Sequence, residues 1–574
     1  MNKKQVFALV KRVLCVLLLI LSLVMTIRTA WTVSTTLMDS DTSSELVLSE
    51  KLAREGGIMS DSWVYSTELQ VIDCQIIYSL LFRLTPDWSL VRFWGSVIMD
   101  LMLLGAMGYL FRQARIPFNR FCLAGAALML PFSIPYGRIV LFHNYYSFQI
   151  AFSFLIVGLY LGAARRLDAW KRWPFWAVTA GLAAAAFATG LGGVRHLMIC
   201  ILPLTVTAVL TALHSEKNGE QGARLRQEAP RVLLALVPLA FAGIGYLVNL
   251  NVLANQYTFK DYSTQTISLG NFGDLHTVLI SLFADLGFQN SQPLFSLEGL
   301  LGISGVVAWI LSLFLAGHTL RRSEEPMARF LSLFWFIVQL VMTCVFLFLT
   351  SEEMLHMLYL LPIMIWILPA LGAADVRKDY GVEAAEAGKP ARRGKRAAKK
   401  QFAFLAGDAP VSVHGALALL ACVLLLANGV LYTGFFRDTS SSKAEYTGLQ
   451  YNDTDTVKGL QPVADYLKEN GYTLIYASYW DAAVLTELTD GQARSVPVQT
   501  GTRKHPIKYM TWLSDMNLWK PEYAARQKVA VVANVDLYYS MQDNEKLEAT
   551  EVASFGAYTI FELVNPAALA EDLA

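Results

Sequence analysis

Three acidic residues follow the first long apolar run of the chain, which covers residues 13–33. They are Asp39, Asp41 and Glu45. A carboxylate held where lipid meets water can act as a general base toward an acceptor hydroxyl, while the attacked substrate keeps its own anchor in the bilayer. The same acids suit a helix start, because Asp39 and Asp41 favour the positive end of the helix dipole and Thr42 with Glu45 fits a capping box. The spacing alone leaves both interpretations open.

Membrane-spanning segments must position these side chains, and the composition of the chain predicts such segments. Of the 574 residues, 55% are hydrophobic and 16% are charged, and the mean hydropathy is +0.41. A soluble chain of ordinary composition is far more polar than this. The formal net charge of +1 carries no overall signature of nucleic-acid binding, so we expect no nucleic-acid partner.

Apolar stretches of about 17–22 residues recur along the chain, and each is long enough to cross a hydrocarbon core of ~30 Å as a helix. There are eleven, at 13–33, 94–111, 118–136, 145–163, 174–193, 197–213, 231–250, 298–319, 329–350, 355–373 and 412–433. The sequence therefore predicts a mainly α fold, a polytopic membrane helical bundle of about eleven spans.

The segments between these stretches fall into two alternating sets with very different charge. The set that includes the N-terminus holds 27 Lys and Arg residues, and the other set, up to residue 356, holds eight. Positive residues are retained on the cytoplasmic side, so we expect a cytoplasmic N-terminus and an extracytoplasmic C-terminus. Residues 1–33 are expected to be a retained anchor rather than a cleaved signal peptide, because no small-x-small site follows the apolar run cleanly.

The chain divides into a membrane module and a tail. Residues 1–437 form the expected transmembrane module, with outer loops at 34–93 and 251–297 and a basic cytoplasmic linker at 375–411 that suits a tether near lipid. Residues 438–574 contain 19 acidic and 11 basic residues. Their short alternating elements predict an extracytoplasmic soluble α/β domain.

Within the tail we expect helices at 456–470 and 481–489, and strands at 472–480, 528–535 and 556–563. No Gly-rich phosphate fingerprint follows any of these strands, so the tail carries no sign of nucleotide binding. The aromatic residues of the strand at 472–480 are expected to pack into the core of the tail; the other interpretation is that this segment faces an acceptor.

The first outer loop carries a wider pattern. From Asp41 the chain continues as an amphipathic run to Gly56, with Leu46, Leu48 and Leu52 among its apolar positions. This arrangement resembles the GT-C superfamily of glycosyltransferases that use polyprenyl-phosphate-linked sugars, the group that contains protein O-mannosyltransferases and lipid A aminoarabinose transferases. In those relatives an Asp-Glu pair follows the first span, and a helix then leads to a Gly.

The resemblance implies an enzyme that moves a sugar from a polyprenyl-phosphate donor, held in the membrane lipid, to an acceptor hydroxyl. The acceptor would be a glycan, a lipid or a protein, and the transfer would be an inverting displacement. Asp41 would accept the hydroxyl proton, and Asp39 or Glu45 would assist or orient it. Thr42 stands where the family usually has Glu, so either another acid compensates or the second carboxylate is dispensable. The apolar segment 71–84 is expected to lie in the interface beside this helix.

The departing polyprenyl phosphate gains negative charge, so cationic or hydrogen-bonding groups are needed near it. Candidate substrate-binding residues at the outer turns are Arg138, His143, Tyr145, Arg195, Lys260, Glu352 and His356. His356 stands roughly where the family has an Arg before a Pro-bearing span. Each basic residue also suits an interfacial anchor, and their shared side of the membrane favours the binding role.

Other functions and cofactors remain open. The six cysteines stand singly, without zinc or redox spacing. One Asp-rich turn without a second ligand cluster argues against an obligatory metal, although some relatives need a divalent metal, so a divalent metal stays possible as a cofactor. A lipid or polysaccharide transporter would need ionisable residues at membrane depth, and Asp100 is the one clear acid within a predicted span. In a non-catalytic envelope binding protein, the first-loop acids would be helix caps only.

Overall fold

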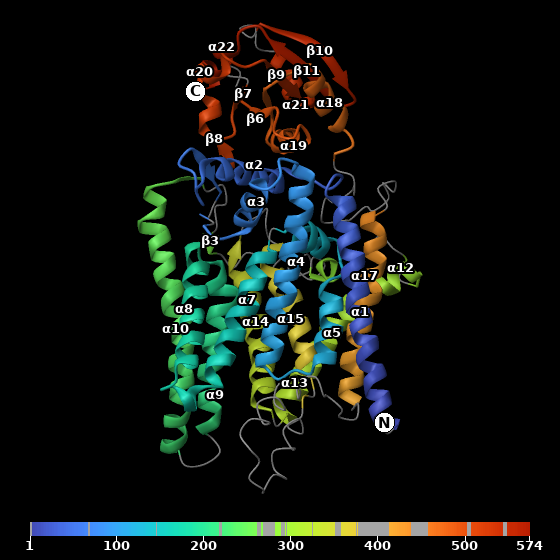
Figure 1. The fold of residues 1–574 in the computed structure, drawn as a ribbon, viewed down its shortest axis with the longest axis vertical. Coiled ribbons are helices and arrows are strands. Elements are labelled where there is room, and N and C mark those ends of the chain that lie inside the picture. The colour runs from blue at the N-terminus through green and yellow to red at the C-terminus, as the bar shows by residue number, and fades with distance from the viewer. Residues whose placement is uncertain are drawn as a thin grey trace.

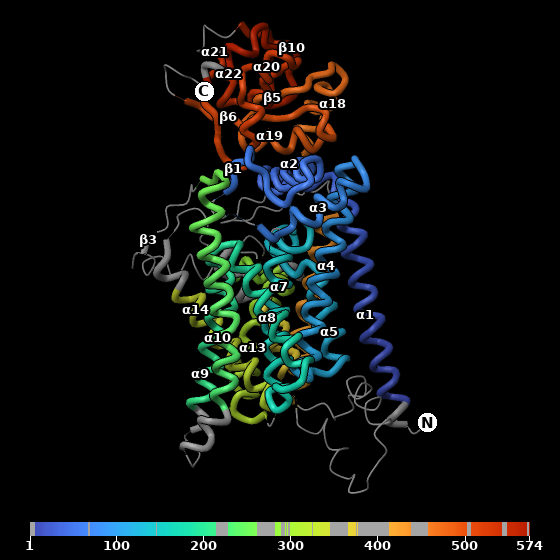
Figure 2. Tube along the Cα trace, turned by 60° about the vertical axis from the view of Figure 1, so that its left-hand side comes forward, coloured from blue at the N-terminus to red at the C-terminus, as the bar shows by residue number. Residues whose placement is uncertain are grey.

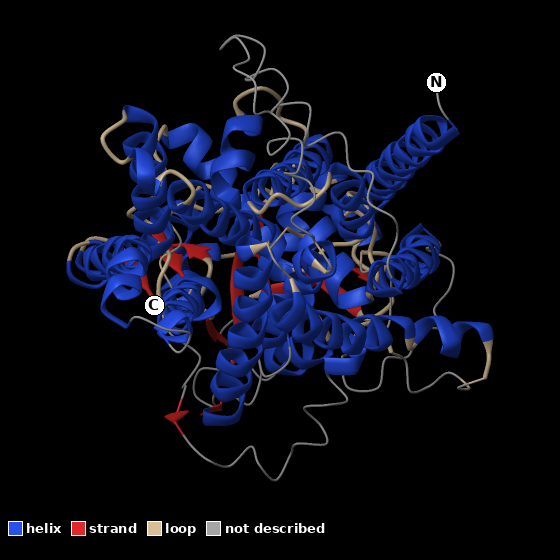
Figure 3. Ribbon diagram, turned by 90° about the horizontal axis from the view of Figure 1, so that it is seen from below, coloured by secondary structure: helices blue, strands red, loops and turns tan. Residues whose placement is uncertain are grey.

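The chain folds into a bundle of long helices with a mixed α/β domain over one end (Figure 1). This computed structural model describes residues 3–573 apart from 67–68, 70, 145, 217–220, 261–265, 268–281, 289–292, 294, 324, 351–356, 375, 377–412, 438–456, 502–506 and 543–547. The long helices run side by side, and the tail domain sits above them in both side views (Figure 2). From below, the N-terminal end of the first helix projects at the rim of the bundle (Figure 3).

Eight of the described helical segments are long and apolar enough to cross a membrane. They fall in α1 (Lys3–Val33), α4 (Trp88–Gln113), α7 (Ser147–Ala164), α8 (Trp173–Leu191), α10 (Gln221–Asn251), α13 (Ser304–Arg322) with α12 (Leu297–Gly302) before it, α14 (Pro326–Phe348) and α17 (Val413–Arg437). Each coincides with a predicted span. The expected fold class, a polytopic membrane bundle with a C-terminal α/β domain, is confirmed.

The other three predicted spans are shorter helices. They are α5 (Phe118–Leu128), α9 (Leu202–Glu216), which continues a π-helix at Leu197–Ile201, and α15 (Met357–Ala373). The stretch at 118–136 is not one helix, because Pro131 and Pro135 interrupt it. A new helix, α6 (Ile134–Tyr136), starts after the cap Ser133 and runs into a π-helix at Gly137–Phe142.

The loops predicted to be cytoplasmic meet at the end of the bundle away from the tail. Arg165 donates to the Gln113 carbonyl at 3.1 Å, and Arg120 donates to the Gly372 carbonyl at 3.1 Å. Arg115 lies 3.8 Å from Glu325. The N-terminus is also at this end (Figure 1). Basic loops far apart in sequence therefore share one side of the bundle.

Two short helices, α2 (Ser40–Glu55) and α3 (Cys74–Phe82), lie across the other end of the bundle, beneath the tail (Figure 1). The capping box of α2 is formed by Asp39 with Thr42, not by Thr42 with Glu45 as the sequence suggested. The helix begins earlier than expected because Asp39 already satisfies the first free N–H groups. It ends at Gly56, whose φ of 78° is readily adopted only without a side chain.

The tail is built on a six-stranded mixed sheet in the order β10-β11-β9-β5-β6-β7, in which β5 runs parallel to β6 and β9. The strands are β5 (Leu474–Ser478), β6 (Arg494–Thr500), β7 (Ile507–Tyr509), β9 (Val529–Ala533), β10 (Ala549–Phe555) and β11 (Tyr558–Leu563). The helices are α18 (Gln461–Glu469), α19 (Tyr479–Leu488), α20 (Pro521–Ala524), α21 (Val535–Gln542) and α22 (Pro566–Leu573), with a 3-10 turn at Met516–Trp519. Side chains alternate along β5 and β9 between two separate apolar cores, one on each face.

The five elements expected in the tail are present as α18, β5, α19, β9 and β11. The predicted strand at 472–480 is too long, because the chain turns into α19 directly after Ser478. Tyr479 and Trp480 therefore belong to a helix.

A small three-stranded sheet ties the predicted outer segments together. Its order is β2-β1-β8, with β1 (Trp63–Tyr65) from the first loop, β2 (Thr258–Phe259) from the second and β8 (Ser514–Asp515) from the tail. The Met516 amide also donates to the Ser62 carbonyl at 2.8 Å. A further pair of short strands is formed by β3 (Thr266–Ile267) and β4 (Leu349–Thr350).

Candidate active site between the bundle and the tail

Asp39 is held in place by four contacts at the start of α2. One carboxylate oxygen accepts from both the amide and the hydroxyl of Thr42 at 2.9 Å, and the other lies 2.9 Å from His143 Nδ1 and 3.4 Å from an Arg138 nitrogen. His143 Nε2 lies 3.2 Å from the Leu37 carbonyl, which orients the ring. Burial raises the pKa of Asp39, but His143 and Arg138 lower it by more, so the net pKa lies well below that of a free aspartate. Asp39 is an anion at neutral pH.

Asp41 lies two residues further along and has a different environment. Its Oδ1 accepts a hydrogen bond from the Tyr479 hydroxyl of the tail. Burial and the negative charge of Asp39 raise the pKa of Asp41 to about 6, although Tyr479 and Arg138 oppose this shift. The other oxygen, Oδ2, makes no hydrogen bond with any described residue. Asp41 therefore offers an open oxygen with proton affinity near neutrality.

Glu45 is one turn further along the same helix. Burial, followed by the charges of Asp73 and Asp41, raises the pKa of Glu45 to about 8. Its carboxyl group makes no hydrogen bond within the described part of the chain. At neutral pH it is therefore mostly protonated.

The three acids thus have three different pKa values within one short stretch of chain. Carboxyl groups whose pKa values are pushed apart can take separate roles in proton transfer. Asp39 is already paired and too weak a base, and Glu45 already carries its proton. Asp41 alone among the three combines an open oxygen with a pKa near the operating range of a general base.

The tail is fixed over these acids by buried ion pairs. Arg92 of α4 binds Glu487 of α19 through two hydrogen bonds, of 2.6 and 2.5 Å, and both side chains are 1% exposed. Ser43 of α2 donates to the same Glu487 at 2.7 Å. Lys51 of α2 pairs with Asp515 of the tail at 2.7 Å. The tail thus forms one wall of the site.

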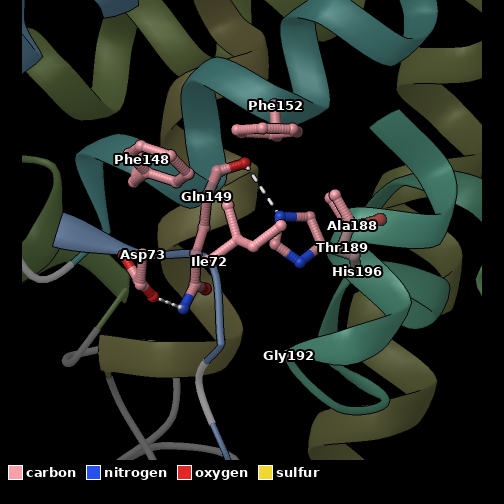
Figure 4. Close-up of a pocket in the computed structure, with 9 residues that line it drawn as sticks. All are labelled: Ile72, Asp73, Phe148, Gln149, Phe152, Ala188, Thr189, Gly192 and His196. Atoms are coloured by element: carbon pink, nitrogen blue, oxygen red, sulfur yellow. Dashed lines mark hydrogen bonds between the residues drawn. The ribbon is translucent and has the colours of Figure 1, made fainter. Parts of the chain in front are cut away.

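A small pocket lies between α7, α8 and the segment that precedes α3 (Figure 4). It is lined by Ile72, Asp73, Phe148, Gln149, Phe152, Ala188, Thr189, Gly192 and His196. The Gln149 side chain donates to Asp73 at 3.4 Å, and His196 Nε2 lies 3.1 Å from the Gln149 carbonyl. The negative charge of Asp73 also raises the pKa of Glu45, so the pocket carries a carboxylate that acts on the third acid of α2.

The structure brings some of the candidate binding residues to the acids and places others elsewhere. Arg138 and His143 contact Asp39 directly. Arg195 lies over the Tyr146 ring, 5.4 Å from its centre, and Lys260 donates to Thr511 of the tail at 2.7 Å. Three further candidates, Tyr145, Glu352 and His356, lie outside the described residues, as does most of the linker at 375–411.

Within the described ranges, no group of three or more His, Cys, Asp and Glu side chains is arranged to hold a metal ion.

Comparisons with known proteins add two likenesses. No family model matches the sequence, and no curated protein matches it either. The chain is similar to the crystal structure of ArnT from Cupriavidus metallidurans bound to undecaprenyl phosphate, with 14% identity over 96% of this chain and 98% of that one and a TM-score of 0.49. It is also similar to an Archaeoglobus fulgidus oligosaccharyltransferase in complex with Zn and sulfate, with 13% identity over 94% of this chain and 72% of that one and a TM-score of 0.46. Likenesses of this degree do not assign a function.

Two contacts of the site were not predicted from the sequence. The aromatic residues near 476–480 were expected to pack into the tail core, and Tyr476 does so with no exposed surface. Tyr479 instead reaches Asp41, which no local pattern indicates. The pairing of Arg92 with Glu487 joins residues almost 400 positions apart. A conspicuous charged residue in an apolar helix was the available signal for Arg92, because such a residue needs a partner.

Proposed function

We propose that the protein is an integral-membrane glycosyltransferase that moves a sugar from a polyprenyl-phosphate donor to an acceptor hydroxyl. The observation that carries this proposal is Asp41, with one oxygen open and a pKa of about 6, at the membrane end beneath the tail. A base placed there can reach a water-soluble acceptor while a lipid-anchored donor stays in the bilayer. The resemblance of the first loop to GT-C enzymes leads to the same class of reaction.

The proposed reaction is a single inverting displacement. Asp41 Oδ2 takes the proton of the acceptor hydroxyl as that oxygen forms a bond to the sugar C1. The bond from C1 to the phosphate oxygen breaks, and the electron pair leaves with the polyprenyl phosphate. Arg138 supplies positive charge and N–H groups near the developing phosphate charge. Both ring nitrogens of His143 lie against protein groups, Asp39 and the Leu37 carbonyl, so His143 acts by holding Asp39 in place.

The proposed orientation puts α2 and the tail on the extracytoplasmic side and the N-terminus in the cytoplasm. The clustering of the basic loops at the opposite end of the bundle supports this arrangement. Labelling of a cysteine at residue 61 from the cell exterior would test it, because Asp61 is exposed in the first loop.

The function is tested by incubating the purified full chain with a panel of polyprenyl-phosphate sugars and extracted envelope glycans, lipids and proteins. We expect release of polyprenyl phosphate together with appearance of the sugar on an acceptor. Binding of a labelled donor without release across the whole panel would contradict the proposal and favour a non-catalytic envelope protein. Movement of the intact donor across proteoliposome membranes would favour a transporter.

The two raised pKa values predict a bell-shaped pH dependence of transfer. Activity should rise with pH through about 6 as Asp41 loses its proton, and fall above about 8 as Glu45 becomes an anion near the donor phosphate. Glu45→Gln mimics the protonated acid, so we expect it to retain activity near pH 7 and to lose the alkaline fall. Rates of polyprenyl-phosphate release between pH 5 and 9 would check this.

Glu55→Gln is the matched control, because Glu55 is at the far end of α2 and pairs with Lys51. It should leave both limbs of the profile unchanged. An alkaline fall that persists in Glu45→Gln would exclude Glu45 as its source.

A further inference from the structure

The start of α19 is where the tail touches the candidate base. Tyr479 is the first residue of this helix, and the preceding strand β5 ends in a buried sheet, so its position follows from the fold of the tail. The Ser40 hydroxyl of α2 donates to the Tyr479 carbonyl. Backbone and side chain of the same residue are therefore both joined to the first turn of α2.

The Tyr479 ring is also fixed sideways. It stacks on Trp512, with ring centres 5.2 Å apart and an angle of 22° between the planes, and only 7% of the residue is exposed. Two turns along α19, Glu487 is tied to Arg92 and Ser43. These contacts hold α19 beside α2 and leave the Tyr479 hydroxyl little freedom to leave Asp41.

We infer that Tyr479 is a positioning residue for the base: its hydroxyl holds Asp41 Oδ1 so that Oδ2 faces the acceptor, which makes the tail a working part of the active site. The role of Asp41 as general base in this inference rests on the proposed function. The hydrogen bond from Tyr479 to Asp41 rests on the structure alone. Asp41 is also faced by Asp39 on its own turn, by Arg138 and by Glu45. Among these groups Tyr479 alone comes from the tail.

The test measures Asp41 directly, without turnover. Purified full-length protein is treated with a carbodiimide and glycinamide between pH 4 and 9, and the labelled fraction of Asp41 is read by peptide mass spectrometry. A hydroxyl donor stabilises the carboxylate, so its removal in Tyr479→Phe should move the midpoint of labelling to higher pH by roughly one unit. Trp512→Leu keeps the hydroxyl but loosens the ring, and should move the midpoint in the same direction by less.

Tyr558→Phe is the matched control. It removes a tyrosine hydroxyl that donates at 3.1 Å to Asp481 on the same helix, away from Asp41. We expect it to leave the labelling midpoint unchanged. Unchanged midpoints in both Tyr479→Phe and Trp512→Leu would overturn the inference, whatever the enzyme proves to do.

Where transfer can be followed, Tyr479→Phe should lower kcat on the order of tenfold and leave KM for the lipid donor unchanged, because the base is misplaced while the donor site is intact. If the labelling midpoint of Asp41 depends on Tyr479 but the wild-type protein transfers no sugar, the proposed function is refuted while the hydrogen bond between Tyr479 and Asp41 is supported. A Tyr479→Phe variant with wild-type kcat at every pH would refute the positioning role.

Discussion

Asp41→Asn is expected to lower the rate of sugar transfer by about 10²–10⁴-fold, the usual contribution of a general base. Asparagine has nearly the same shape and can still accept the hydrogen bond from Tyr479, but its amide cannot take the acceptor proton. The variant should therefore fold and bind the lipid donor as the wild type does. Release of polyprenyl phosphate from a labelled donor measures the rate, and equilibrium binding of the same donor measures the retained site.

Asp61→Asn provides the control, because Asp61 is an exposed acid in the same loop and belongs to no part of the proposed site. Its rate should equal that of the wild type. Transfer by Asp41→Asn at the rate of Asp61→Asn would exclude Asp41 as the base and move attention to Glu45. A loss of donor binding equal to the loss of rate would instead assign Asp41 to substrate binding.

The membrane architecture was predictable because the bilayer imposes a length on every span. Helices such as α1 and α17 are continuous apolar runs, and their composition is sufficient to find them. The stretch at 118–136 has the same composition but contains Pro131 and Pro135, and it divides into α5 and a shorter segment that ends near His143. That break shapes the candidate site, because it brings Arg138 back to Asp39.

The candidate site was predictable only in part. Asp39, Asp41 and Glu45 could be singled out because acids directly after an apolar run lie where lipid meets water, and Arg138 and His143 because basic groups gathered at the outer turns. The different states of the acids could not be predicted, since they depend on contacts made across the fold. Tyr479 was predicted to lie in a strand, but it is the first residue of α19, which begins two residues before the predicted helix at 481–489. Such a boundary lies within the uncertainty of any pattern-based assignment.

The second large expected effect is a loss of stability when the ion pair that attaches the tail to the bundle is broken. Glu487→Ala would leave the Arg92 guanidinium buried without its counter-charge, in a position where the side chain is 1% exposed. Removing one partner of a buried ion pair costs about 3–5 kcal/mol of folding stability, because the other charge is left unpaired. Replacing both partners by well-packed apolar residues costs far less. We therefore expect Glu487→Ala to lower the unfolding temperature of the purified protein strongly, and to raise the labelling midpoint of Asp41 as Tyr479 moves away.

The double variant Arg92→Met with Glu487→Leu separates the two causes. It removes both charges and fills their space with apolar side chains, so most of the lost stability should return. Asp490→Asn removes an exposed pair, which joins Lys468 to Asp490 at 3.1 Å, and should change stability by at most about 1 kcal/mol. If the double variant were as unstable as Glu487→Ala, the geometry of the ion pair itself, rather than an unpaired charge, would be what holds the tail over Asp41.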